Sequence, residues 1–135
     1  MSVIVDTSVW SLALRRQTSA TSNPVVERLK HLISDDQVTM VGTIRQEILS
    51  GIKHSDQFNR LQDYLRAFPD IPLSSEDYEL AATFFNTCRS QGVQGSNTDF
   101  LICAIAHYRN FPILTTDKDF KYFQQYIPVH LLLDD

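Results

Sequence analysis

The sequence has little cysteine and no long hydrophobic run, and each shortage excludes a class of protein. Its two cysteines, Cys88 and Cys103, are too few for a disulfide framework, and both lie in apolar helical patterns typical of buried thiols. The apolar runs are too short, and too often interrupted by Arg, Asp or Gln, to span a bilayer. The amino terminus also lacks the charged-then-apolar pattern of a signal peptide. These absences favour a cytoplasmic protein.

Positive charge is also in short supply. Lys and Arg number 12 against 16 Asp and Glu, which gives a net charge of −4 and an isoelectric point of about 5.4. That balance argues against a broad basic surface for nonspecific binding of nucleic acid. No internal repeat or low-complexity linker divides the chain, and its 135 residues are enough for one domain with a buried core.

What the chain does have is a set of acids that each end an apolar segment or enter a helix. The first follows residues 3–5, a β-branched run typical of a buried strand, so Asp6 is predicted at the carboxyl end of that strand. Ligands bind at this edge in open parallel sheets. The alternative is that Asp6, Thr7 or Ser8 only caps the following helix.

The second acid, Glu47, lies on a helix predicted over residues 44–50, after a strand at residues 38–41. Thr43 and Gln46 have the spacing of a capping box for this helix. Glu47 adjoins the apolar stripe of the helix, which places its carboxylate beside the buried face. A carboxylate in that position needs a partner.

The third acid, Asp99, opens an almost wholly apolar helix that continues over residues 100–106. Ser96 and Asp99 have the spacing of a capping box. The position near the helix amino terminus also keeps a carboxylate ionised and able to bind a cation. The capping role and the cation-binding role are compatible.

The fourth acidic segment follows a short strand predicted at residues 111–114. It contains Asp117 and Asp119, and Asp and Thr after a strand are ordinary turn formers. Together with the other three segments, however, it completes a cluster of acids at one edge of a sheet.

Several carboxylates in one cleft repel one another, so a fold that assembles them needs a cation to offset the cost. Hard oxygen ligands select Mg²⁺ or Mn²⁺, and no spacing of Cys and His here indicates zinc. Such a metal lowers the pKa of a water nucleophile and stabilises charge on a phosphoryl group, as in nucleases and phosphatases. The acids therefore predict a divalent metal site.

In this order, the segments around Asp6, Glu47, Asp99 and Asp117 resemble the motifs of PIN domains, and their separation is similar to that of the small PIN proteins called VapC toxins. The resemblance covers essentially the whole chain. It implies a single PIN-like nuclease domain over residues 1–135, with a three-layer α/β/α fold and a central, mainly parallel sheet of four to five strands. The alternation of predicted strands and helices agrees with such an α/β fold.

The resemblance further implies a metal-dependent endoribonuclease whose Mg²⁺ or Mn²⁺ is coordinated by Asp6, Glu47, Asp99 and Asp117. Asp119 also stands near the expected place of the last ligand. We favour Asp117 because it lies nearer to the end of the strand.

Thr7, Ser8 and Thr116 are the supporting hydrogen-bond donors that the resemblance suggests, with Asp119 as a further supporting residue. The implied partners are an RNA substrate, with transfer or ribosomal RNA favoured, and a VapB-like antitoxin whose tail blocks the site. A homodimer is also implied. No membrane partner is expected.

Two other classes of protein place acids at strand ends. One is a metal-dependent phosphatase or a phospho-acceptor signalling domain. The haloacid-dehalogenase phosphatases would have a second Asp where Ser8 stands, and a receiver domain would have a Lys after a late strand, whereas Lys118 lies between two acids. The other class is a noncatalytic binding module that uses the acids as caps; the presence of all four acids counts against it.

The remaining segments complete the alternating pattern. Helices are predicted to begin at Asn23, Ser55 and Ser74, and short strands are expected at residues 71–73 and 129–133. Pro72 would place the first of these strands at a sheet edge, because it cannot donate a ladder hydrogen bond.

Two surface features remain open at the level of sequence. The apolar residues within 58–68 pack in the core or form an interaction surface, and core packing is the simpler interpretation. A set of cations near the predicted ligands forms either a local basic rim or ordinary solvated charges. These cations are Arg15, Arg16, Arg45, Lys53, Lys118 and Lys121.

Overall fold

The computed structural model describes residues 1–15 and 23–132, with the side chain of Arg15 left out. Its elements alternate less regularly than the sequence predicts, because four helices stand in succession between the second and third strands. The first five are β1 (Val3–Val5), α1 (Thr7–Arg15), α2 (Pro24–Ser34), β2 (Val38–Thr39) and α3 (Gly42–Leu49). They are followed by α4 (Ser55–Leu65), α5 (Ser75–Ser90), α6 (Asn97–Arg109), β3 (Ile113–Leu114) and α7 (Asp119–Phe123).

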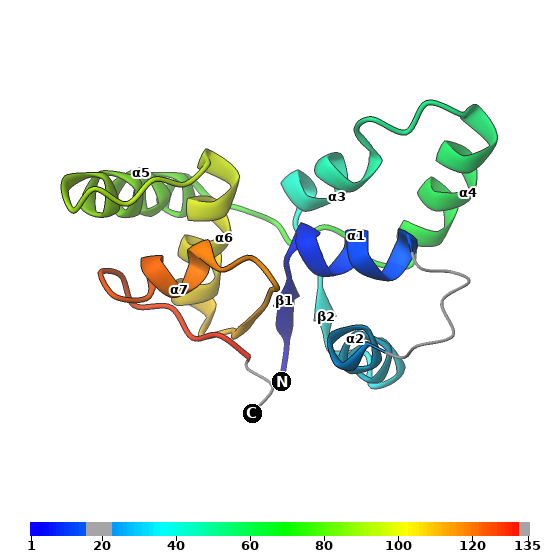
Figure 1. Ribbon diagram of the computed structural model, residues 1–135, viewed down its shortest axis with the longest axis horizontal. Helices are drawn as coiled ribbons and strands as arrows, with labels where there is room; N and C mark the ends of the chain where they lie inside the picture. The colour runs from blue at the N-terminus through cyan, green and yellow to red at the C-terminus, as the bar shows by residue number, and fades with distance from the viewer. Residues whose placement is uncertain (16–22, 133–135) are drawn as a thin grey trace.

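The sheet is parallel, with β1 in the centre and the strand order β2-β1-β3. Val3 pairs with Val38 on one side of β1, and Val5 pairs with Leu114 on the other. All three residues of β1 are fully buried, because helices flank the sheet. Figure 1 shows α3 and α4 on one side of β1 and α5, α6 and α7 on the other. The predicted α/β class with a parallel sheet is confirmed.

The predicted strand count of four to five is wrong, because the described residues form three strands. The segment at residues 71–73 contributes only a bridge between Met40 and Asp70, where Ile71 donates its N–H to Met40. Pro72 follows and has no N–H with which to continue the ladder.

At the other edge, Leu131 forms a single bridge with Ile113, and Leu133 of the predicted 129–133 strand lies outside the described residues. The pairing between β3 and this segment is limited to that bridge, and β3 itself is only two residues long. The chain turns away at Thr115, whose hydroxyl binds Asp6.

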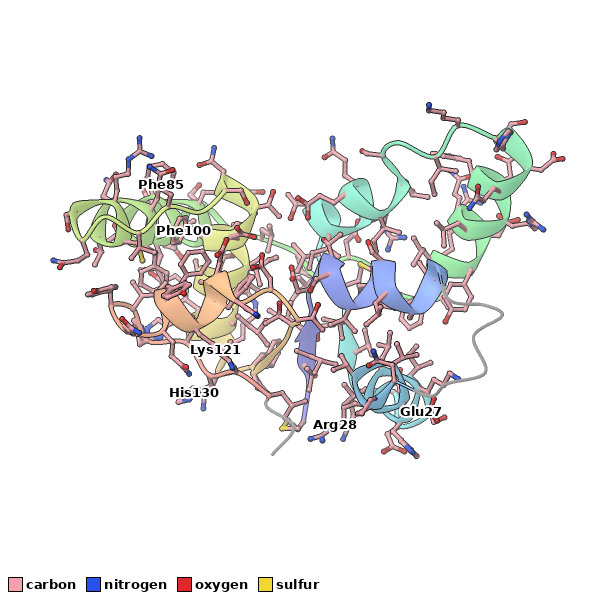
Figure 2. The ribbon with its side chains drawn as sticks, viewed as in Figure 1. Glu27, Arg28, Phe85, Phe100, Lys121 and His130 are labelled. Carbon is pink, nitrogen blue, oxygen red and sulfur yellow. The ribbon has the colours of Figure 1, made fainter. Side chains whose placement is uncertain are left out.

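Helix α6 is the most deeply buried helix segment, and its burial confirms the prediction from its apolar run. Residues 100–106 are each at most 5% exposed. The ring of Phe100 packs against Phe85 of α5 with 5.5 Å between centroids (Figure 2). Cys88 and Cys103 are free and buried, as predicted, and burial raises the pKa of both thiols.

The loop that leads into α6 requires a glycine. A Cβ on Gly95 would lie 2.5 Å from the ring of Phe123 and 3.0 Å from that of Phe100. Because rings pack so closely against this backbone, the amino end of α6, which carries Asp99, is fixed above the core.

Most predicted helix starts agree with the structure. Asn23 and Ser74 are N-cap residues, whereas Ser55 is the first residue of α4 after the N-cap His54. The capping box predicted for Thr43 and Gln46 is wrong. The chain passes directly from the β2 region into α3, so the helix begins at Gly42, and no side chain caps it.

The described helices are all too short or too polar to cross a membrane.

Candidate functional site

A hollow of about 580 Å³ opens at the carboxyl edge of the sheet, and four acids from four parts of the chain line it. Asp6 follows β1, Glu47 lies on α3, Asp99 lies in the first turn of α6, and Asp117 lies in the loop after β3. The remaining lining residues are polar: Thr7, Ser8, Thr43, Gln46, Ser50 and Thr98. We call this hollow the acid site.

Asp6 is buried, and two hydroxyls hold one of its oxygens. Ser8 donates to Asp6 Oδ2 at 2.7 Å, and Thr115 donates to the same oxygen at 2.8 Å. Ser8 in turn accepts a hydrogen bond from the backbone N–H of Thr116. Two neutral donors thereby fix the carboxylate, one from α1 and one from the residue after β3. Neither hydrogen bond neutralises its charge.

Glu47 is exposed, but a hydroxyl orients its side chain. Thr7 Oγ1 donates to Glu47 Oε1 at 2.6 Å. The link joins the first residue of α1 to α3, so the two helices are connected directly beside Asp6.

Asp99 has the capping role that the sequence predicts. Its side chain accepts the backbone N–H of Ser96, and the Ser96 hydroxyl accepts the backbone N–H of Asp99. Burial raises the pKa of the Asp99 carboxyl, the two Ser96 bonds oppose that change, and the neighbouring charges of Asp6 and Asp117 raise it further. Asp6, Asp99 and Asp117 all line the same hollow, which accounts for this repulsion.

Asp117 and Asp119 occupy different places. Asp117 lines the acid site and accepts the backbone N–H of Asp119 on Oδ1 at 2.9 Å, while its own N–H donates to Thr115 Oγ1. Asp119 is the first residue of α7 and does not line the acid site.

The four acids share one pattern of hydrogen bonding. Each has one carboxylate oxygen held by a donor of the chain and a second oxygen that accepts no hydrogen bond from the described residues. These four oxygens therefore belong to side chains that line one polar hollow. This is the donor chemistry that Mg²⁺ or Mn²⁺ prefers.

As placed, no three acid, His or Cys side chains of residues 1–15 and 23–132 meet closely enough to form a ready-made metal cage. Mg²⁺ keeps several waters and uses only one or two direct carboxylates, so the ligands need not meet at one point. The residues present therefore fit a hydrated divalent cation.

One residue of the acid site was missed from the sequence. Thr115 holds Asp6 through its side chain, whereas the side chain of Thr116, the predicted donor, is exposed and only its backbone N–H is used. Thr115 directly follows β3, and its side chain reaches Asp6 at the end of the neighbouring β1. The sequence alone does not reveal which of the two adjacent threonines does this. Thr43 also lines the site, and its buried hydroxyl has no hydrogen-bond partner among the described residues.

The cations near the ligands do not form one rim. Arg45 links α3 to the end of α4, because it donates to Asp70 at 2.9 Å and to the carbonyls of Leu65 and Phe68. Lys118 and Lys121 are exposed and line neither the acid site nor the hollow beside it. Figure 2 shows Lys121 near the carboxyl-terminal part of the chain, on the other side of β1 from α4. The side chain of Arg15, and all of Arg16, lie outside the described residues.

Comparison with known families gives the same result as the motifs. The model of the PIN domain family matches residues 3–125 of the sequence. This chain belongs to the PIN domain family. The predicted membership is thus confirmed, and the chain does not fall among the haloacid-dehalogenase or receiver domains. No curated protein matches the sequence.

Solved structures of similar fold come from several bacteria. VapBC2 from Rickettsia felis, bound to a DNA fragment from its promoter, is 17% identical with a TM-score of 0.78, and all of both chains is covered. FitAcB from Neisseria gonorrhoeae is 20% identical with a TM-score of 0.73, covering 97% of this chain and 96% of that one. VapBC-1 from nontypeable Haemophilus influenzae is 17% identical with a TM-score of 0.73 and the same coverage. At these identities the likeness shows the PIN fold.

Proposed function

We propose that this protein is a Mg²⁺- or Mn²⁺-dependent endoribonuclease and the cytoplasmic toxin of a type II toxin–antitoxin pair. The observation that carries the proposal is the acid site of a PIN domain, where four carboxylates line one hollow and each has one oxygen that accepts no hydrogen bond from the described residues. A structural role for the acids would fill those oxygens with donors of the chain, as happens at Asp77 below. Open carboxylate oxygens instead suit a cation and water.

In this proposal Asp6, Asp99 and Asp117 hold the metal directly or through water. The bound ion supplies positive charge that lowers the pKa of a water and stabilises charge on the phosphoryl group. Glu47 orients or deprotonates the attacking water. The Thr7 hydroxyl on Oε1 fixes the rotamer of Glu47 and leaves Oε2 to accept the proton.

The reaction is hydrolysis of an RNA phosphodiester. The water oxygen bonds to phosphorus, the bond from phosphorus to the 3′ oxygen breaks, and that oxygen takes a proton. The products carry a 5′-phosphate and a 3′-hydroxyl. Transfer or ribosomal RNA is the substrate class that we favour.

The proposed partners follow from the solved structures of similar fold. Several of these are VapBC complexes, so we propose a VapB-like antitoxin for this chain, together with a homodimer. An open reading frame for a small protein next to the gene would support the antitoxin.

The test incubates the purified chain with total transfer RNA and ribosomal RNA in Mg²⁺ or Mn²⁺ and maps new 5′ ends. We expect discrete cuts that disappear in EDTA and in Asp99→Asn. Asp119→Asn is the matched control, because it removes an equal charge two residues beyond Asp117 but outside the acid site. This variant should cut like the native chain.

Other outcomes would reassign the site. Hydrolysis of a phosphomonoester without any cut in RNA would make the protein a phosphatase. If neither substrate reacts and no metal binds, the acids are structural and the chain is a noncatalytic binding module.

A further inference from the structure

A second hollow, of about 930 Å³, adjoins the acid site on the side of α4. Glu47 and Ser50 line both hollows, so the two hollows lie next to each other. The residues that line the second hollow come from α1, α3, α4 and the segment that joins α3 to α4. Figure 1 shows how these elements are arranged. We call it the α4 groove.

The charge of the α4 groove is opposite to that of the acid site. Lys53, His54 and Arg60 line it, and Glu47 is the one acid among its described lining residues. All three basic side chains are exposed, and none forms an ion pair within the described part of the chain. Four cations elsewhere do form ion pairs, namely Lys30, Arg45, Arg66 and Arg109. The groove therefore holds positive charge that the protein itself leaves unneutralised.

The groove also contains an anchored aromatic ring. Tyr64 lines it and is 46% exposed. Its ring meets Phe68 edge to face with 5.8 Å between centroids, and Phe68 meets the buried ring of Trp10 at 5.3 Å. A ring held from one side and open on the other is a stacking surface for an unpaired base.

An RNA substrate needs such a surface next to the acid site. Four carboxylates repel a polyanion, and the net charge of −4 gives no general attraction. The free energy for binding must therefore come from a basic region close by. The α4 groove shares Glu47 with the acid site, and Glu47 is the residue that orients or deprotonates the attacking water in the proposed mechanism.

We propose that the α4 groove binds the single-stranded RNA flank next to the scissile phosphate. Lys53 and Arg60 contact backbone phosphates, His54 adds a polar contact, and Tyr64 stacks on a base. The inference rests on the proposed ribonuclease function. It makes these four residues positioning residues for the substrate, outside the chemical step.

Binding is measured by fluorescence anisotropy with a short fluorescein-labelled single-stranded RNA of mixed sequence, in EDTA so that no cleavage occurs. For Lys53→Gln/Arg60→Gln we expect Kd to rise about tenfold and the slope of log Kd against log salt to fall by about 1.4, since each phosphate contact to a single strand contributes about 0.7. Lys30→Gln/Arg66→Gln is the control. It removes the same charge from ion-paired cations outside the groove, so it should leave both quantities unchanged.

The aromatic contact has its own pair of variants. Tyr64→Ala should raise Kd at least about fivefold, whereas Tyr64→Phe should bind like the native chain because it keeps the ring. Thermal unfolding of each variant shows that the fold is retained. The salt slope is the second readout, since a merely structural defect does not change the number of phosphate contacts.

The outcomes separate this inference from the proposed function. If RNA is cut in Mg²⁺ while the groove variants bind like their control, the groove assignment is wrong and the nuclease stands. If no RNA is cut but the groove variants lose binding as expected, the groove stands and the nuclease proposal is wrong. If polyglutamate displaces the RNA and Tyr64→Ala has no effect, the groove is a site for an acidic peptide and the RNA assignment is wrong.

Discussion

Asp6 and Asp77 are the two buried acids of the described chain, at 5% and 1% exposure, but their surroundings differ. Both oxygens of Asp77 bind the guanidinium of Arg109, at 2.8 Å and 3.0 Å, and Oδ2 also accepts the N–H of Ser74. Asp6 has hydroxyls on one oxygen and no cation on either.

The difference shows how a structural acid can be told from a functional one. Burying a carboxylate is costly unless it is paired, and the chain supplies a bidentate partner for Asp77, which ties α5 to α6. The Arg109 bond lowers the pKa of the Asp77 carboxyl. At Asp6 the fold supplies only neutral donors, so its charge remains available to a cation from outside.

The largest expected effect is that Asp6→Asn and Asp77→Asn have opposite consequences. Asp6→Asn should abolish activity and leave stability intact, whereas Asp77→Asn should lower stability and leave activity intact. Asp6→Asn should lower RNA cleavage at least about 10³-fold, equivalent to about 4 kcal/mol, because a proposed metal ligand is lost. Its free energy of unfolding should stay the same or rise, because repulsion among the carboxylates decreases. Cleavage assays and urea unfolding measure the two effects.

Asp77→Asn should do the reverse. It leaves Arg109 without its anion and should lower the free energy of unfolding by about 3 kcal/mol, while cleavage per folded molecule is retained. A stability loss for Asp6→Asn as large as that for Asp77→Asn would contradict the distinction between the two acids.

A smaller effect concerns the hydroxyls that fix Asp6. Thr115→Val keeps the shape of the side chain and removes one donor, so we expect metal affinity, measured by titration calorimetry, to fall about tenfold. Thr116→Val is the matched control, because only the backbone N–H of Thr116 is used, and it should bind metal normally. Equal effects of the two variants would show that Thr115 does not position Asp6.

The smallest effect is a pH dependence that belongs to Asp77. Because its folded-state pKa is lowered from 3.8, its ionised form contributes stability above that value, and this contribution is lost as pH falls through the lower folded-state pKa. The free energy of unfolding should therefore decrease with acid below about pH 4 more steeply in the native chain than in Asp77→Asn. Parallel curves in urea unfolding across that range would contradict the assignment.

Local features were predictable from the sequence because their causes are local. The burial of α6 follows from its unbroken apolar run. The capping box formed by Ser96 and Asp99 follows from their spacing of three residues. A cluster of acids at the sheet edge could be expected because Asp6 and Asp117 follow strands and Asp99 opens a helix, and all four acids, Glu47 included, line one hollow in the structure.

The predictions from sequence were wrong where tertiary contacts decide the local structure or the position of a side chain. Thr43 has the spacing of a cap, but the helix begins earlier because the chain enters it directly from the β2 region. Residues 71–73 have the pattern of a strand, but Pro72 limits the pairing to one bridge. Arg45 stands two residues from Glu47 in the chain, yet its guanidinium crosses to Asp70 and holds the end of α4.

The sequence by itself determined the α/β class, the PIN family and the four acids. Strand and helix patterns and caps depend on neighbouring residues, and the order of the motifs can be read along the chain. Only the tertiary structure decided which hydroxyl holds Asp6, which acid receives an arginine and which cations remain unpaired beside the acid site. Those properties depend on side chains that approach from distant segments, and the spacing of residues along the chain does not specify such approaches.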